Sequence, residues 1–174
     1  MNFEKIKLVI FDNDGVLTDG KIVYDDKKIE SKNFSAKDGL GIRLLQKAGI
    51  NIAVITGRTS HILEKRCDDL QITHLYQKIR NKLKKTEELL AEMDLAWENV
   101  AYLGDDWNDY PVMKRCGISA VPADAFNSYK EKADLVLQRK GGEGAVREFI
   151  EIILKEQGIF EQTVEKLVDY LESC

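Results

Sequence analysis

Short runs of apolar and β-branched residues alternate with helical patterns along most of this 174-residue chain. Runs of roughly four to eight such residues are typical of buried strands, and strand–helix alternation leads to right-handed crossovers between parallel strands. Strands are predicted at residues 6–12, 50–56, 73–77, 100–105, 118–122 and 135–138. Helices are predicted at residues 40–47, 60–70, 82–93, 110–115 and 127–132. The pattern therefore predicts an α/β fold with helices on both faces of a mostly parallel sheet.

Two segments depart from this alternation. Residues 20–35 have the pattern of a β-hairpin inserted after the first strand, with a polar turn at residues 25–28. Such a hairpin would stand over the carboxyl ends of the strands or pair with a neighbouring subunit. At the other end, glycines at residues 141, 142 and 144 precede two amphipathic helices, the second in a tail at about 158–174 that we expect to pack on the sheet or on a partner. We expect residues 1–174 to form a single domain.

Composition excludes several classes of protein. With 26 basic and 30 acidic side chains and a net charge of −4, the chain has no basic field for a nucleic acid. No apolar run approaches the roughly 20 residues of a membrane helix, and the first residues lack a signal-peptide core. Cys67, Cys116 and Cys174 fit no zinc or disulfide spacing, and His61 and His74 are isolated. These features predict a cytoplasmic protein with reduced thiols and no membrane or nucleic-acid partner.

Chemically reactive side chains stand where four predicted strands end. Asp12 and Asp14 follow the first strand, and Thr56, Gly57 and Arg58 follow the second. The corresponding positions after the third and fourth strands hold Lys82, Asp105, Asp106 and Asp109. The carboxyl ends of parallel strands meet at one edge of the sheet, which is where such folds bind their ligands.

This set of residues suits phosphoryl transfer from a monoester. Asp12 can act as the nucleophile, and Asp14 can protonate the leaving oxygen and later activate water. Asp105 can complete an oxygen site for Mg²⁺, while Thr56 and Lys82 can bind phosphate oxygens. Each residue alone has an ordinary explanation: a strand end, a solvated lysine, or an acid at a helix start. Their joint occurrence at strand ends favours a catalytic site.

In this order, the DxD motif, Thr, Lys and the GDDxxxD-like acids at residues 104–109 resemble the motifs of the haloacid dehalogenase superfamily over nearly the whole chain. The chain more closely resembles 3-deoxy-D-manno-octulosonate 8-phosphate (KDO 8-phosphate) phosphatases. That closer resemblance rests on residues 11–20, 37–43, 55–58, 72–77, 104–113 and 141–148. It implies a capless, Rossmann-like three-layer sandwich and a homotetramer whose hairpins pair at its centre, with neighbouring subunits closing each active site.

The resemblance also implies a role for individual residues. Asp12 would be the nucleophile and Asp14 the acid and base, with Mg²⁺ held by Asp12, the backbone carbonyl of Asp14, and Asp105. Asp106 and Asp109 would lie beside these ligands. The positions that match substrate contacts are Asp14, Ser35, Ala36, Lys37, Asp38, Gly39, Arg43, Gly57, Arg58, Arg66 and Lys82. Several cations suit a sugar acid that carries both a carboxylate and a phosphate.

Two positions depart from the family pattern. Asn13 replaces a small or apolar residue, and we expect its side chain to point away from the reacting groups because neighbours on a strand alternate faces. Lys78 stands where the family usually has glycine, so the pattern does not predict the exact conformation of the turn before Lys82.

The implied function is Mg²⁺-dependent hydrolysis of KDO 8-phosphate through an aspartyl-phosphate, in lipopolysaccharide biosynthesis. Two alternatives stay open. One is the same reaction on a nine-carbon sugar-acid 9-phosphate, such as neuraminate or KDN phosphate. Arg58 disfavours this, because the nine-carbon branch resembles having glutamate there. The other is a non-catalytic sugar-acid-binding domain, which the intact set of reactive residues disfavours. A P-loop kinase is disfavoured because no GxxxxGK[ST] motif follows any strand.

Overall fold

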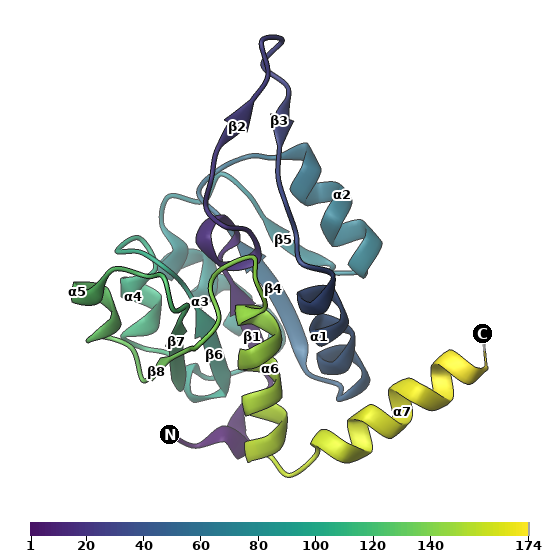
Figure 1. Ribbon diagram of the computed structural model, residues 1–174. Coiled ribbons are helices and arrows are strands. Elements are labelled where there is room, and N and C mark those ends of the chain that lie inside the picture. The colour runs from purple at the N-terminus through teal and green to yellow at the C-terminus, as the bar shows by residue number, and fades with distance from the viewer. Residues whose placement is uncertain (174) are drawn as a thin grey trace.

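A six-stranded parallel sheet forms the centre of the computed structural model, which describes residues 1–173 (Figure 1). The strand order is β5-β4-β1-β6-β7-β8. The strands are β1 (Leu8–Phe11), β4 (Asn51–Ile55), β5 (His74–Tyr76), β6 (Val100–Leu103), β7 (Ile118–Val121) and β8 (Leu135–Val136). Because β1 lies between β4 and β6, the residues that follow these three strands meet at one edge of the sheet.

Two layers of helices bury the two faces of this sheet. The helices are α1 (Ala36–Lys47), α2 (His61–Leu70), α3 (Lys82–Met93), α4 (Tyr110–Met113), α5 (Asn127–Lys130), α6 (Ala145–Glu156) and α7 (Phe160–Glu172). Alternate residues of β1 face opposite sides, so that Val9 packs with α1, α2 and α6 whereas Ile10 packs with α3, α4 and α5. The structure is therefore the three-layer α/β sandwich predicted from the alternation of strands and helices.

A separate two-stranded antiparallel sheet lies between β1 and α1 in the chain. It pairs β2 (Val23–Tyr24) with β3 (Glu30–Ser31) and projects from the body of the molecule (Figure 1). Asp25 closes its turn, since its Oδ1 accepts from the backbone N–H groups of Lys27 and Ile29. Near this projecting end the apolar side chains of Ile22, Val23, Tyr24 and Ile29 are exposed.

The observed boundaries differ from the predicted ones most at the start of the first long helix. Helix α1 begins at Ala36, four residues before the predicted start, because Ser35 Oγ accepts from the backbone N–H of Asp38 and caps the helix. Helices α4 and α5 have only four residues each. The last helix, α7, packs through Leu167 against the core beside α1. Cys174 lies outside the described residues.

None of the helices in the described part of the chain combines the length and apolar character needed to cross a membrane. Cys67 is buried, and both Cys67 and Cys116 are free thiols.

Candidate active site

Asp12 stands at the centre of the site because it directly follows β1, the central strand of the sheet. Its backbone N–H donates to the carbonyl of Leu103 at 3.1 Å, which continues the strand pairing by one residue. The chain then turns through residues Asn13–Leu17, with Gly15 at φ +89°. A Cβ at Gly15 would lie 2.1 Å from Oδ2 of Asp105, so this turn requires glycine both for its backbone angle and for space.

A buried group of charges lies behind Asp12. Nζ of Lys82, the first residue of α3, lies 2.8 Å from Oδ1 of Asp12 and 2.6 Å from Oδ1 of Asp109. The hydroxyl of Tyr102 donates to the same oxygen of Asp109 at 2.6 Å. The other oxygen of Asp109 accepts from the backbone N–H groups of Asp105 and Asp106 at 3.2 and 3.5 Å. Asp109 therefore fixes both Lys82 and the loop that carries Asp105.

The carboxylates of this group repel one another. Burial, together with the negative charge of Asp109, raises the pKa of Asp12 to about 7, even though Lys82 opposes the shift. Burial and the charges of Asp12 and Asp109 raise the pKa of Asp105 to about 8. Burial works against the charge of Lys82, but Asp109 and Asp12 outweigh it and raise the pKa of the ammonium. The site thus has more negative charge than its single lysine balances.

Three carboxylates in this group could hold a metal ion. One oxygen each from Asp12, Asp105 and Asp109 lie within 4.8 Å of one another. Both oxygens of Asp109 already accept hydrogen bonds, so Asp12 and Asp105 have the greater capacity for a cation. Carboxylate oxygens are the ligands that Mg²⁺ prefers, usually one or two per ion with water and phosphate oxygens. The residues present therefore fit a hard divalent cation.

A cleft of about 260 Å³ opens above these carboxylates. It brings together seven of the residues singled out in the sequence: Asp12, Asp14, Thr56, Gly57, Arg58, Asp105 and Asp106. Gly20 and Asn108 also line it, although the sequence analysis assigned neither of them a role. Across the cleft from Asp12, Thr56 Oγ1 accepts from the backbone N–H of Arg58 at 3.4 Å. Lys82 is not part of the lining of the cleft, but it contacts Asp12 through an ion pair.

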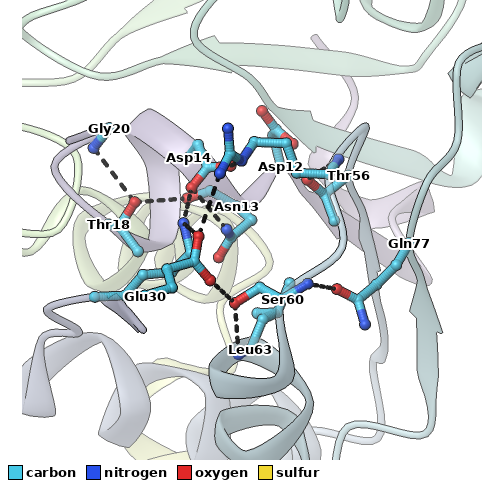
Figure 2. A network of polar contacts seen from close by, with 12 residues as sticks. Asp12, Asn13, Asp14, Thr18, Gly20, Glu30, Thr56, Ser60, Leu63 and Gln77 are labelled. Atoms are coloured by element: carbon cyan, nitrogen blue, oxygen red, sulfur yellow. Dashed lines mark hydrogen bonds and ion pairs between the residues drawn. The ribbon is translucent and has the colours of Figure 1, made fainter. Parts of the chain in front are cut away.

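Asp14 lies in a second polar network, which includes the hairpin (Figure 2). Lys32 and Arg58 approach its two carboxylate oxygens, and Glu30 contacts both of these cations. Ser60 Oγ donates to Glu30 at 2.6 Å, and Gln77 Oε1 accepts from the backbone N–H of Ser60 at 2.6 Å. The sequence analysis missed Glu30 and Lys32. The available signal was a pair of opposite charges two residues apart at the end of the second hairpin strand.

Asn13 does not point away from the reacting groups, and that expectation was wrong. Its side-chain amide donates to Oδ1 of Asp14 at 3.0 Å, and the residue is buried (Figure 2). The alternation of strand faces does not apply here because β1 ends at Phe11 and Asn13 begins a turn. Lys78 adopts the left-handed region at φ +59°, a conformation that explains a preference for glycine at its position.

The segment 35–39, with Arg43 and Arg66, lies outside the lining of this cleft. Arg66 donates to the carbonyl of Ser35 at 3.1 Å and stands over the ring of Phe34. Arg43 caps the end of α2 by donating to the carbonyl of Asp69 and the side chain of Gln71. These residues gather around α1 and α2.

Asp38 serves the fold in this chain. Its two carboxylate oxygens accept from the backbone N–H groups of Gly144 and Arg147, at the start of α6. Burial raises its pKa, against the effect of these hydrogen bonds. Asp38 thereby connects the first turns of α1 and α6 and has little capacity left for a ligand.

The parallel sheet, the Asp12 turn and the acidic loop after β6 define a haloacid dehalogenase-like hydrolase, and residues 70–150 match that family. The chain is 46% identical over 155 residues to the KDO 8-phosphate phosphatase KdsC of Escherichia coli K12, covering 89% of this chain and 82% of that protein. The chain therefore belongs to the KDO 8-phosphate phosphatase family.

Two solved structures are closely similar. The KDO 8-phosphate phosphatase of Yersinia pestis has a TM-score of 0.89 and 45% identity, over 91% of this chain and 86% of that one. The enzyme of Moraxella catarrhalis was solved with a magnesium ion, a phosphate ion and KDO. It has a TM-score of 0.91 and 34% identity, over 95% of each chain.

Proposed function

We propose that this chain is a Mg²⁺-dependent phosphomonoester hydrolase that converts KDO 8-phosphate to KDO and phosphate, in lipopolysaccharide biosynthesis. The observation that carries this proposal is the placement of Asp12 between Lys82 and Asp105 at the carboxyl end of the central strand. The relationship to the Escherichia coli phosphatase and to the Moraxella catarrhalis complex supports the substrate.

Asp12 is the nucleophile in the proposed reaction. One of its carboxylate oxygens attacks phosphorus, the bond from phosphorus to the sugar oxygen breaks, and Asp14 gives its proton to that oxygen. Asp14, now ionised, takes a proton from a water molecule as the water oxygen attacks phosphorus. The bond to Asp12 breaks, and phosphate leaves. Asp12 is then a free carboxylate again and Asp14 again carries its proton.

The remaining residues of the cleft bind and orient the phosphate. Asp12, Asp105 and the backbone carbonyl of Asp14 would hold Mg²⁺, which would supply positive charge to the phosphate oxygens. Thr56 contributes its hydroxyl and the turn at Gly57 a backbone N–H group. Lys82 favours the ionised form of Asp12, against the effect of burial, and holds its side chain in place through the 2.8 Å ion pair. Asp106 and Asp109 hold the loop around Asp105.

Arg58 is the residue that we assign to the carboxylate of the sugar acid. It lines the cleft, and its planar guanidinium suits bidentate recognition of a carboxylate. In the single chain Arg58 Nη2 donates to the hydroxyl of Tyr24 at 2.8 Å, so the hairpin helps to orient it.

We infer further that the hairpin assembles four subunits. The exposed side chains of Ile22, Val23, Tyr24 and Ile29 form an apolar surface that a neighbouring hairpin would cover. In such an assembly the residues 35–39, Arg43 and Arg66 would contact substrate across subunit boundaries. Light scattering tests this: the wild type should have the mass of a tetramer, and Ile22→Asp with Ile29→Asp should give smaller species.

The free thiols of Cys67 and Cys116 fit a reducing, cytoplasmic location.

The test of the activity is phosphate release in the presence of Mg²⁺. We expect kcat/KM for KDO 8-phosphate to exceed that for neuraminate 9-phosphate and KDN 9-phosphate by about 100-fold, or roughly 2.7 kcal/mol. If all three compounds are hydrolysed slowly and at equal rates, the proposed reaction is retained but the assigned substrate is wrong. Absence of turnover would favour the binding domain instead.

A further inference from the structure

Lys32 is an almost fully buried lysine on the hairpin, and the proposed reaction gives it no role. Its side chain is only 1% exposed. Nζ of Lys32 lies 2.5 Å from Oδ1 of Asp14 and 3.4 Å from Oε1 of Glu30. Burying an ammonium costs several kcal/mol unless it is paired, so these two carboxylates account for its position. The chain thus places a cation from the hairpin directly on Asp14.

Asp14 receives a partner on each side. Oδ1 accepts from Lys32 and, at 3.0 Å, from the side-chain amide of Asn13. Oδ2 has Nε of Arg58 at 3.7 Å, beyond hydrogen-bond distance. Oδ1 is therefore fixed by two donors, whereas Oδ2 is the oxygen left for a substrate in the cleft.

Glu30 stabilises this arrangement from the hairpin side. Its Oε1 is 3.3 Å from Nη2 of Arg58 and 3.4 Å from Nζ of Lys32, and its Oε2 accepts from Ser60. The network thus joins two carboxyl groups, of Asp14 and Glu30, to two cations, Lys32 and Arg58. Because Glu30 and Lys32 lie on the hairpin while Ser60 and Arg58 follow β4, the network connects the hairpin to the central sheet (Figure 2).

We propose that Lys32 is a positioning residue, which holds Asp14 so that Oδ2 faces the leaving oxygen of the substrate. This inference rests on the proposed role of Asp14 as the acid. A general acid must be within about 2.6–3.2 Å of the atom it protonates, and displacement by about 1 Å can cost 100-fold in rate. Without Lys32, Oδ1 retains only the neutral amide of Asn13, and the carboxyl group can rotate.

The experiment compares two leaving groups in the Mg²⁺-loaded enzyme. A sugar alkoxide needs a proton as it departs, whereas p-nitrophenolate leaves without one. We expect Lys32→Met to lower kcat/KM for KDO 8-phosphate by about 10- to 100-fold, and kcat/KM for p-nitrophenyl phosphate by less than about threefold. A merely structural role, or lost attraction for the phosphate, would lower both values equally and overturn the proposal.

Two variants serve as controls. Lys32→Arg keeps a cation beside Asp14 and should restore most of the activity on KDO 8-phosphate. Lys27→Met changes an exposed lysine at the turn of the same hairpin and should leave both kcat/KM values unchanged. Light scattering and thermal unfolding of each variant show whether its assembly and fold are retained. If Lys32→Met fails to fold, Lys32→Gln is measured in the same way.

Asp14→Asn separates this proposal from the one on which it rests. If Asp14→Asn is impaired equally with both leaving groups, the acid role of Asp14 is wrong, and the positioning role is wrong with it. If Asp14→Asn shows the leaving-group dependence but Lys32→Met does not, only the role of Lys32 is wrong. The double variant Lys32→Met/Asp14→Asn should be no slower than Asp14→Asn, because both changes remove the same function.

Discussion

Nζ of Lys82 donates to Oδ1 of Asp109 at 2.6 Å, and the two side chains are only 1% and 0% exposed. Asp109 is held further by Tyr102 and by the loop of Asp105, and Lys82 by Asp12. A buried ion pair of this kind is costly to break, because removing one partner leaves the other charge uncompensated. The pair therefore supports the fold and the site together.

Replacement of Lys82 by methionine should destabilise the protein by about 3–5 kcal/mol, because Asp12 and Asp109 would remain buried without their cation. Activity should fall with it. Urea unfolding measures the loss, and Lys84→Met, at an exposed position two residues further along the same helix, is the matched control. The double variant Lys82→Met/Asp109→Asn should recover part of the stability. A Lys82→Met protein as stable as the wild type would contradict this account.

Asp12→Asn should lower phosphate release by at least about 1000-fold, since a carboxamide is a poor nucleophile. The side chain at position 12 should stay buried, so we expect the variant to fold. Rapid-quench experiments on the wild type should trap a phosphorylated enzyme that Asp12→Asn lacks. Substantial turnover by a clean preparation of the variant would exclude Asp12 as the nucleophile.

Mg²⁺ affinity should rise with pH between about 6 and 8.5. The raised pKa values of Asp12, about 7, and Asp105, about 8, mean that protons compete with the cation in this range. In the metal-free folded protein, Asp12 and Asp105 keep their protons up to these raised pKa values. In the unfolded chain the same side chains release their protons above the ordinary pKa of 3.8. Stability should therefore fall as pH rises from about 4 to 8.

Thermal unfolding with and without MgCl₂ at several pH values checks both statements. The increase in midpoint caused by Mg²⁺ should be larger at pH 8.5 than at pH 6, and Asp105→Asn should abolish most of it. An increase that is independent of pH would show that these carboxylates do not bind the ion.

Gly15→Ala should lower activity by about 100-fold or more, because the added Cβ would lie 2.1 Å from Oδ2 of Asp105 and displace a metal ligand. Gly49 provides the control. It has a similar φ of +75° but nothing within 4 Å of a Cβ. Gly49→Ala should therefore cost about 1–2 kcal/mol of stability from backbone strain while its kcat/KM stays that of the wild type. Equal activity losses in the two variants would refute the steric argument.

Lys78→Gly should increase the free energy of unfolding by up to about 1 kcal/mol. Glycine relieves the left-handed strain at φ +59°, although part of the gain is lost to the greater entropy of the unfolded chain. The backbone N–H of Lys78, which donates to the carbonyl of Arg58 at 3.2 Å, is kept in the variant. Phosphate release should be unchanged, and guanidinium unfolding measures the stability.

Local sequence was enough to place most of the cleft. Asp12, Thr56 and Asp105 each come within two residues of the end of a parallel strand, and such ends share one edge of the sheet. The prediction for Asn13 failed because it extended the strand periodicity past the last paired residue. The four-residue error at the start of α1 has a similar cause, since the cap at Ser35 decides the boundary.

Periodicity and strand ends are local properties, so the layers of the fold and the row of reactive groups along the sheet edge could be predicted from the amino-acid sequence. Which charges meet depends on the folded arrangement of the elements. Lys32 reaches Asp14 because the chain returns from the hairpin beside the turn that follows β1, and Tyr102 reaches Asp109 because the loop after β6 turns inward. Arg43 and Asp38 instead bind helix ends. Contacts of this kind depend on the relative placement of whole elements, which their own residues do not encode locally.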